Sequence, residues 1–239
     1  MIGALVTGVS AERWNEAHRM EQAYWSAGGF GLRRFHHIVS GSIKAAEWAA
    51  PHLDLPAGDW LEIGIGPLGV GCAHFLGPEG DLHTIDPIGP TAGDDWRMLP
   101  EPCKALVRSC HETAVMRIGQ AERLDFPENQ FVFVASKNML DHVEDPDAVL
   151  KEVRRVLKPG RRFLLIVDTY SLLGEARFRL VVQRKLRDTI FVKSHPHRFS
   201  RRRIEQLLDE TGFRIVQTEG ASGLATLVGH GYRMSVLAA

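Results

Sequence analysis

Three glycines and an acidic residue stand where an apolar run of the sequence ends, in Trp60-Leu61-Glu62-Ile63-Gly64-Ile65-Gly66-Pro67-Leu68-Gly69. The apolar run predicts a buried strand, and the glycines predict a tight turn in which the backbone can approach a ligand closely. A helix that follows such a turn presents free backbone N–H groups to the ligand. The loop can therefore hold the pyrophosphate of a dinucleotide, or an amino-acid-bearing nucleoside such as S-adenosylmethionine.

A second acidic residue, Asp86, ends the next apolar run, 22 positions after Gly64. A carboxylate at the end of a second parallel strand lies beside the loop that follows the first strand, where it can accept hydrogen bonds from ribose hydroxyls. The pairing favours a ligand of nucleoside type. It fits an NAD(P)-dependent oxidoreductase as well as an enzyme that uses S-adenosylmethionine.

Eleven histidines supply groups that exchange protons near neutral pH. Candidates for a catalytic base come from the N-terminal 55 residues, from the segment after the apolar run over residues 131–135, which predicts the fourth strand, and from the basic stretch near residue 195: His36, His37, His142 and His195. His195-Pro196-His197 has the residue type of a metal site, but no carboxylate or cysteine lies near it in the sequence. We therefore expect no metal site.

The overall composition is that of an ordinary globular protein, with 44% hydrophobic residues, 24% charged residues and a formal net charge of zero. Three scattered cysteines predict reduced thiols rather than a disulfide framework, and no apolar run is long enough for a membrane span. We expect no signal peptide and a cytoplasmic protein.

Basic residues are concentrated between Ala176 and Arg203, a stretch that contains ten Lys and Arg residues and only one acidic residue, Asp188. Three interpretations remain open: a solvated surface, recognition of an anionic acceptor by arginine, and contact with acidic lipid. The stretch lacks the aromatic platform of single-strand binders, so we expect no nucleic-acid partner.

The elements that must position these residues form one domain over residues 1–239. Residues 1–55 predict a helical cap, with helices over about 11–27 and 41–50 and an aromatic, basic stretch over 30–37 between them. From residue 56 onward, short apolar runs alternate with helical patterns, which predicts a parallel sheet with helical crossovers. A basic insertion over about 170–200 interrupts this core.

Three blocks after residue 120 carry a resemblance to a known family: Gln120-Ala121-Glu122-Arg123-Leu124-Asp125-Phe126-Pro127, Leu140-Asp141-His142-Val143-Glu144-Asp145-Pro146 and Arg155-Val156-Leu157-Lys158-Pro159-Gly160. With them, residues 55–220 resemble class I S-adenosylmethionine-dependent methyltransferases, in particular the group that methylates quinones, sugars and natural products. The resemblance implies a doubly wound, Rossmann-like α/β fold with a mostly parallel seven-stranded sheet. In that family the third glycine of the loop usually stands one residue earlier than Gly69, and an aspartate often stands where this chain has Val132.

The resemblance also implies the roles of individual residues in binding the cofactor S-adenosylmethionine. Glu62 would reach the methionine amino group, Asp86 would hold the ribose hydroxyls, and Pro87 or Ile88 would touch the adenine. The remaining cofactor-binding residues that it implies are Gly64, Gly66 and Gly69 in the loop, Ala121 and Glu122 at the adenine edge, and Ser136, Lys137 and Asn138 after the fourth strand.

Transfer of a methyl group from a sulfonium is an in-line displacement, so the protein has mainly to align the acceptor and exclude water. A base is needed when the acceptor is a hydroxyl. We expect a small-molecule or saccharide-like acceptor, anionic and methylated at oxygen, with Tyr24, Trp25, His197 and Arg198 as substrate-binding residues. The sequence does not identify the acceptor. An NAD(P)-dependent oxidoreductase and a non-catalytic nucleoside-binding module remain the alternatives, and a homodimer is an open alternative for the oligomeric state.

Overall fold

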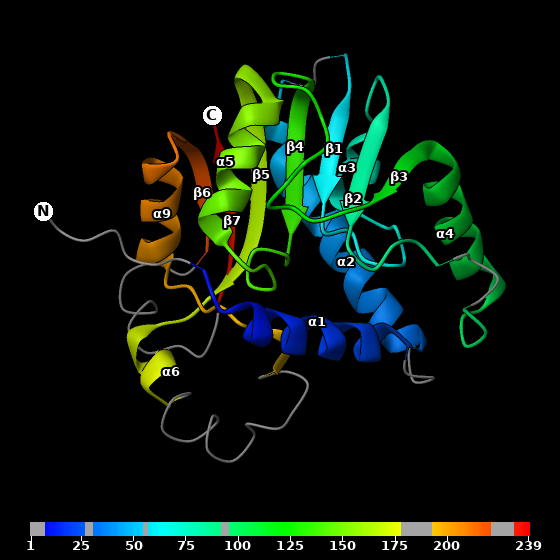
Figure 1. The fold of residues 1–239 in the computed structure, drawn as a ribbon. Coiled ribbons are helices and arrows are strands. Elements are labelled where there is room, and N and C mark those ends of the chain that lie inside the picture. Colours follow the sequence, from blue (N-terminus) through cyan, green and yellow to red (C-terminus); the bar gives the residue numbers. More distant parts are fainter. Residues whose placement is uncertain (1–7, 27–30, 55–56, 92–95, 178–192, 221–231) are drawn as a thin grey trace, which may run out of the picture.

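The computed structural model describes residues 8–26, 31–54, 57–91, 96–177, 193–220 and 232–239. Its centre is a seven-stranded sheet in the order β3-β2-β1-β4-β5-β7-β6 (Figure 1). The strands are β1 (Trp60–Ile63), β2 (Leu82–Asp86), β3 (Ala114–Ile118), β4 (Phe131–Lys137), β5 (Leu157–Thr169), β6 (Ile215–Glu219) and β7 (Tyr232–Ala238). Only β7 runs antiparallel to its neighbours in this sheet. The doubly wound, mostly parallel sheet predicted from the sequence is therefore confirmed.

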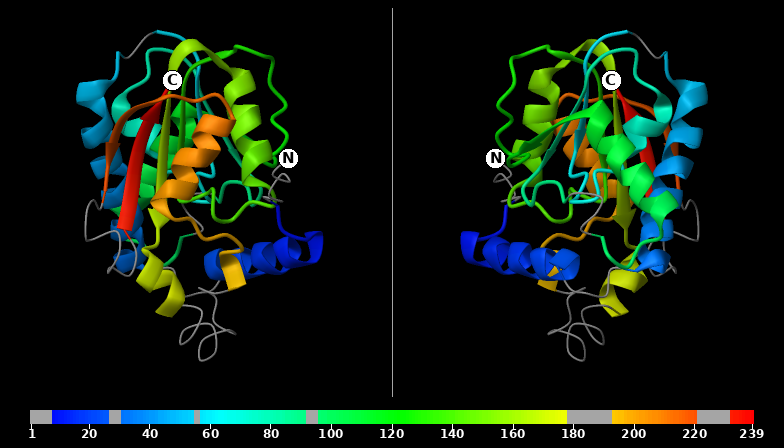
Figure 2. Two further views of the ribbon diagram at one scale, coloured as in Figure 1. Left: turned by 90° about the vertical axis from the view of Figure 1, so that its left-hand side faces the viewer. Right: turned by 90° about the vertical axis from the view of Figure 1, so that its right-hand side faces the viewer.

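Helices cover both faces of the sheet, as the two side views show (Figure 2). They are α1 (Ala11–Ser26), α2 (Leu32–Ala49), α3 (Cys72–Leu76), α4 (Glu101–Thr113), α5 (Pro146–Val156), α6 (Leu172–Arg177) and α9 (Arg201–Glu210), with a short 3-10 turn, η1, over Ala50–His52. One core lies under α5 and α9. A second lies under α2 and α3, and a third joins α2 to α4.

Local sequence signals explain several of these elements. β4 begins with an unbroken apolar run over residues 131–135, as expected of a strand that is buried on both faces of the sheet. The side chain of Asp145 caps α5 by accepting hydrogen bonds from the backbone N–H groups of Asp147 and Ala148, and Pro146 occupies the first helical position. Ser200 caps α9 in the same way, through the backbone N–H of Arg203.

The second helix of the cap begins earlier than the sequence pattern predicts, at Leu32 rather than near Gly41. Its buried stripe starts at Phe35 and continues through Val39, Ser42, Ala45, Ala46 and Ala49 at helical spacing. The aromatic, basic stretch is thus the first half of α2, and the helix tolerates Gly41 in its interior because the buried stripe runs past it.

β1 and β4 are neighbours in the centre of the sheet, whereas the chain passes from β1 to β2 on the opposite side. This is the point at which the strand order reverses, and ligands of open α/β sheets bind outside the carboxyl ends of the strands there. The helix α1 lies across that end of the sheet (Figures 1 and 2).

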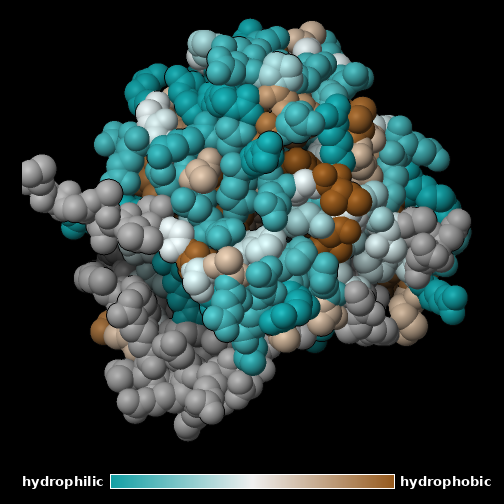
Figure 3. Space-filling model, in the orientation of Figure 1, coloured by the Kyte–Doolittle hydropathy of each residue, from teal (hydrophilic) through white to brown (hydrophobic). Residues whose placement is uncertain are grey.

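The surface seen in Figure 3 is mostly hydrophilic, with one group of apolar residues to the right of centre. In the described part of the chain, no helix has both the length and the apolar character that crossing a membrane requires. All three cysteines carry free, buried thiols. Cytoplasmic location and oligomeric state stay predictions.

Candidate active site

The glycine loop after β1 is built as the sequence predicts, with positive φ angles of 74° at Gly64 and 69° at Gly66. A Cβ atom on Gly64 would lie 2.3 Å from the Met139 side chain, and one on Gly66 would lie 2.9 Å from the Trp25 ring. Both positions therefore require glycine for conformation and for space. The loop closes in a turn in which the Gly69 backbone N–H donates to the Gly66 carbonyl at 3.1 Å, and Pro67 stands at the second turn position, where its ring fits.

Gly69, the third glycine of the loop, stands one residue later than in the family pattern, and its position is explained by a contact with α4. Gly69 also has a positive φ, of 68°, and a Cβ atom there would lie 2.6 Å from the His111 ring. His111 comes from α4 and contacts the loop carbonyl of Leu68 through Nε2 at 3.0 Å. Gly69 thus lets α4 approach the loop, and it is absent from the cavity wall described below.

Glu62, at the end of β1, is 2% exposed and is engaged by the start of α3. Its carboxylate accepts hydrogen bonds from the backbone N–H groups of Cys72 and Ala73, each at 2.8 Å. Gly71 makes this possible, because a Cβ atom there would lie 2.0 Å from Glu62 Oε2. A carboxylate at a helix N-terminus is favourable. Glu62 therefore holds the loop against α3, and its contact with a ligand's ammonium group stays a prediction.

Asp86, at the end of β2, connects two segments of the site. Its Oδ2 accepts a hydrogen bond from the Gly66 backbone N–H at 2.8 Å, and its Oδ1 accepts one from Ile88 at 2.9 Å. Burial raises the pKa of Asp86, although the two hydrogen bonds oppose that shift. Each carboxylate oxygen has a further lone pair, so the group can fix the loop and still accept hydrogen bonds from a ligand.

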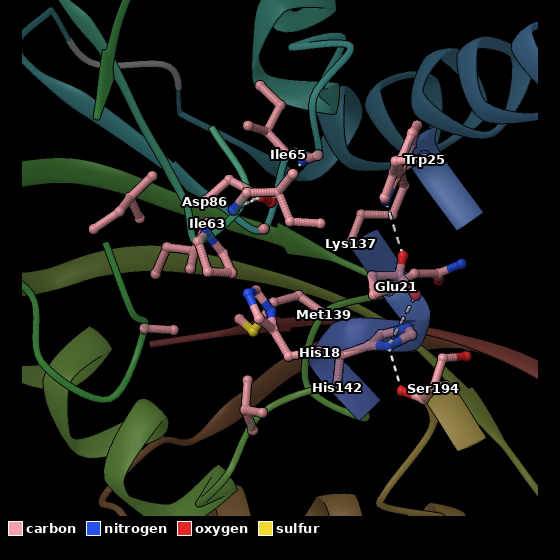
Figure 4. Close-up of a pocket in the computed structure, with 18 of the residues that line it drawn as sticks. His18, Glu21, Trp25, Ile63, Ile65, Asp86, Lys137, Met139, His142 and Ser194 are labelled. Carbon is pink, nitrogen blue, oxygen red and sulfur yellow. Dashed lines mark hydrogen bonds and ion pairs between the residues drawn. The ribbon is translucent and has the colours of Figure 1, made fainter. Parts of the chain in front are cut away.

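These residues line one cavity of about 460 Å³ at the carboxyl end of the sheet, within the range of small-molecule sites (Figure 4). Nine of the eleven predicted cofactor-binding residues contribute to its wall: Glu62, Gly64, Gly66, Asp86, Pro87, Ala121, Glu122, Lys137 and Asn138. Gly69 and Ser136 do not. Ser136 is fully buried within β4, and its hydroxyl has no hydrogen-bond partner among the described residues.

The helix α1 forms the opposite wall of the cavity. It contributes the predicted substrate residues Tyr24 and Trp25 and four further residues that were not predicted as part of the site: Trp14, Ala17, His18 and Glu21. Their spacing of three and four positions was the available signal, since it places them on one helix face. The Trp25 indole N–H donates to Glu21 Oε1 at 2.9 Å, and this pair faces the glycine loop (Figure 4).

Of the four histidines predicted as bases, three lie in the cavity wall and one does not. His142, His195 and His37 line the cavity, whereas His36 is exposed on α2 and does not. Burial lowers the pKa of His142, but the neighbouring carboxylates of Asp141 and Glu21 outweigh it, so that the net shift is upward.

Two predicted substrate residues also lie outside the cavity wall. The His197 ring contacts the Val143 carbonyl through Nε2 at 2.9 Å and stacks on Phe199, and burial lowers its pKa. The Arg198 guanidinium lies over the Tyr170 ring, 5.4 Å from its centroid. About half of the basic insertion, residues 178–192, lies outside the described residues, and so does the segment over 221–231.

Comparison with known proteins agrees with this geometry. The family model of a methyltransferase domain matches residues 97–165. A relative from Shewanella oneidensis, a ubiquinone/menaquinone biosynthesis C-methyltransferase, is 28% identical over 137 residues, which cover 57% of this chain and 50% of that protein. The chain spans about half, or less, of the length of the curated relatives it matches.

Two solved structures show the same fold. An S-adenosylmethionine-dependent methyltransferase from Thermotoga maritima has a TM-score of 0.57 at 19% identity, covering 92% of this chain and 98% of that one. A geranyl diphosphate methyltransferase in complex with S-adenosylmethionine has a TM-score of 0.60 at 12% identity, covering 82% and 84%. These structures confirm the Rossmann-like fold, and together with the methyltransferase-domain match over residues 97–165 they confirm the predicted resemblance to class I methyltransferases.

Proposed function

We propose that this protein is an S-adenosylmethionine-dependent methyltransferase that acts on a small-molecule acceptor, anionic or saccharide-like, at oxygen. The observation that carries the proposal is a single cavity. It joins the glycine loop, Asp86, the Ala121–Glu122 segment and Asn138 at the carboxyl edge of a methyltransferase-like sheet. The methyltransferase-domain match over residues 97–165 supports the same reading.

The residues present fit the cofactor. Gly64 and Gly66 leave the backbone bare where a Cβ atom would fill the space, and Asp86 presents a buried carboxylate at the cavity wall. Glu122, also in the cavity wall, accepts a hydrogen bond from the Glu144 backbone N–H at 2.7 Å. When bound, S-adenosylmethionine supplies a methyl group that its positive sulfur already activates for displacement.

The protein's own part is to position the acceptor and exclude water, because displacement needs alignment more than covalent help. Trp25 and Tyr24 supply apolar surface from α1, and Lys137 supplies a cationic group that favours an anionic acceptor. Four imidazoles line the wall, those of His18, His37, His142 and His195, and an imidazole in this position can accept the proton of an acceptor hydroxyl, which supports methylation at oxygen.

A comparison of S-adenosylhomocysteine binding with NAD binding tests the cofactor class. At about 100 times its Kd, a ligand stabilises the folded state by about 2.7 kcal/mol, which for a chain of this size raises Tm by about 5–10 °C. We expect that shift with S-adenosylhomocysteine and none with NAD, measured by differential scanning fluorimetry. A shift with NAD alone would instead identify an oxidoreductase.

The acceptor class is tested in the same preparation with S-adenosylmethionine that carries a ¹³C-labelled methyl group. The panel contains hydroxylated carboxylic acids, sugar phosphates and quinols. The chemical shift of the transferred methyl separates an O-methyl product, which we expect, from the C-methyl product that the Shewanella relative's name would suggest. Binding of S-adenosylhomocysteine without transfer to any acceptor would favour a nucleoside-binding module.

A further inference from the structure

We propose that Asp141, His142 and His195 form a binding site for a divalent transition-metal ion in the wall of this cavity. One ligand atom from each of the three residues lies within 4.8 Å of the other two. His195 is remote from the other two residues in the sequence. For this reason no carboxylate is found among the sequence neighbours of His195-Pro196-His197. The fold supplies that carboxylate from Asp141.

Ser194 orients both imidazole rings. Its carbonyl lies 2.8 Å from His142 Nδ1 (Figure 4). Its hydroxyl lies 3.0 Å from His195 Nδ1. A carbonyl can only accept, so the neutral His142 ring carries its proton on Nδ1 and has a lone pair on Nε2. Histidines that ligate metals are fixed in this way, with the second ring nitrogen hydrogen-bonded to a carbonyl or a carboxylate.

The two Nε2 atoms are directed toward the same carboxylate. His142 Nε2 lies 3.9 Å from Asp141 Oδ1, and His195 Nε2 lies 3.7 Å from Asp141 Oδ2. These distances are too long for hydrogen bonds. They are only about 0.4–0.6 Å longer than the separation of about 3.3 Å between two ligands of a tetrahedral ion with bonds of about 2.0–2.1 Å, so a small inward movement of the side chains would complete the site. The two rings stand side by side, with centroids 4.3 Å apart.

Asp141 gives an independent reason to expect a ligand. Its side chain is only 10% exposed, and Oδ1 is buried without a hydrogen-bond partner in the described part of the chain. A buried carboxylate oxygen in that state is unfavourable unless a cation or donor satisfies it. An ion held by both imidazoles would do so directly.

Backbone contacts fix the two ligand-bearing segments to each other. The His197 backbone N–H donates to the Asp141 carbonyl at 3.2 Å, and the His197 ring contacts the Val143 carbonyl. From the other side, Arg13 of α1 donates to the Lys193 carbonyl at 2.6 Å. His197 is therefore a positioning residue, and the segment over 193–197 is held in place before any ion arrives.

Two nitrogen ligands and one carboxylate suit Zn²⁺, Co²⁺, Ni²⁺ or Fe²⁺ better than Mg²⁺ or Ca²⁺, which prefer oxygen. Three protein ligands leave a coordination position open, as in catalytic sites, and His142 and His195 face the cavity. In the proposed methyltransferase, on which this step rests, an acceptor hydroxyl could occupy that position and lose its proton more readily. Metal binding itself does not depend on that function.

Metal titration of chelator-treated protein tests the site, with Co²⁺ followed by its visible absorption and Zn²⁺ by calorimetry, each without and with S-adenosylhomocysteine. We expect one ion per chain. His195→Ala and His142→Ala should each weaken binding by about 100-fold or more, since a ligand matters at least as much as its orienting partner. His36→Ala, on an exposed histidine outside the cavity, should leave metal affinity unchanged.

The variants must still be folded, which the unfolding temperature of His195→Ala without any ligand reports independently. A second group of ligand-type residues, Asp59, Asp81 and His83, could also bind the probe ions. If His83→Ala abolishes binding while His195→Ala retains it, the proposal is overturned. It also fails if neither ion binds below about millimolar concentration. If S-adenosylhomocysteine produces no thermal shift in the unsubstituted protein while the metal ion still binds, the proposed function is refuted and the metal site stands.

Discussion

At the scale of single residues, the acids of the site organise the protein before they meet a ligand. Glu62 holds the amides that begin α3, and Asp86 holds the amides of Gly66 and Ile88. The loop is therefore rigid through charge-assisted hydrogen bonds, which are stronger than neutral ones. Glycine matters where these contacts are closest, at Gly71 beside Glu62 and at Gly64 beside Met139.

Asp86→Asn should weaken the binding of S-adenosylhomocysteine by about 10- to 100-fold, because hydrogen bonds to a charged group contribute about 1.5–3 kcal/mol. The amide also places an N–H group against the backbone N–H of Gly66 or Ile88. Asp81→Asn, on an exposed residue just before β2 and at its opposite end, is the matched control. Isothermal calorimetry measures both affinities, and equal changes in the two variants would remove Asp86 from the site.

At the scale of elements, α1 is the wall that completes the cavity. Trp25 lies against Gly66 and contacts the Trp96 ring edge-on, with centroids 6.5 Å apart. Near its start, the same helix is tied to the segment over 193–195 by Arg13 and by the Glu16–Lys193 ion pair at 3.3 Å. The two covering segments of the cavity thus support each other.

Trp25→Ala should release S-adenosylhomocysteine about tenfold faster. The substitution removes an apolar side chain whose burial over the loop contributes about 1–3 kcal/mol, and it admits water to the cavity. Trp48→Ala is the control, since Trp48 packs against the core under α2 and takes no part in the cavity wall. Stopped-flow dissociation measures the rates. Identical rates in both variants would mean that α1 does not retain the ligand.

At the scale of the whole molecule, the three thiols report on the integrity of the core. Burial raises the pKa of Cys110 to about 12, and it raises the pKa of Cys72 well above its usual value, with the Glu62 carboxylate adding to both shifts. Reaction with a disulfide reagent requires the thiolate. The folded protein therefore keeps these two thiols out of reach in two ways, by burial and by protonation.

At pH 8, we expect a chromogenic disulfide reagent to react with Cys72 and Cys110 only as the protein unfolds. Saturating S-adenosylhomocysteine should slow that reaction further, because a ligand that binds only the folded state reduces the unfolded population. Denaturant gives the control value of three thiols per chain. Two equivalents that react at once in the native protein would contradict the buried core described above.

The sequence by itself determined the parts of this protein that depend on local patterns. Unbroken apolar runs identify buried parallel strands, and glycine and acidic residues at the ends of β1 and β2 mark one edge of one sheet because parallel strands end together. Most of the cofactor-binding residues predicted from these patterns and from the family resemblance do line the cavity. The start of α2 was missed because its buried stripe continues through an aromatic and basic stretch.

Only the tertiary structure decided which distant segments meet. The face of α1 toward the loop, the approach of His111 to Gly69 and the exclusion of His36 and His197 from the cavity all depend on packing between elements. Ser194 reaches His142 across 52 positions of sequence, and His195 reaches Asp141 with it. Residue spacing fixes which side chains share a helix or a strand. It carries no information on which covering segment folds back over the sheet, because long-range burial, and not local periodicity, sets that contact.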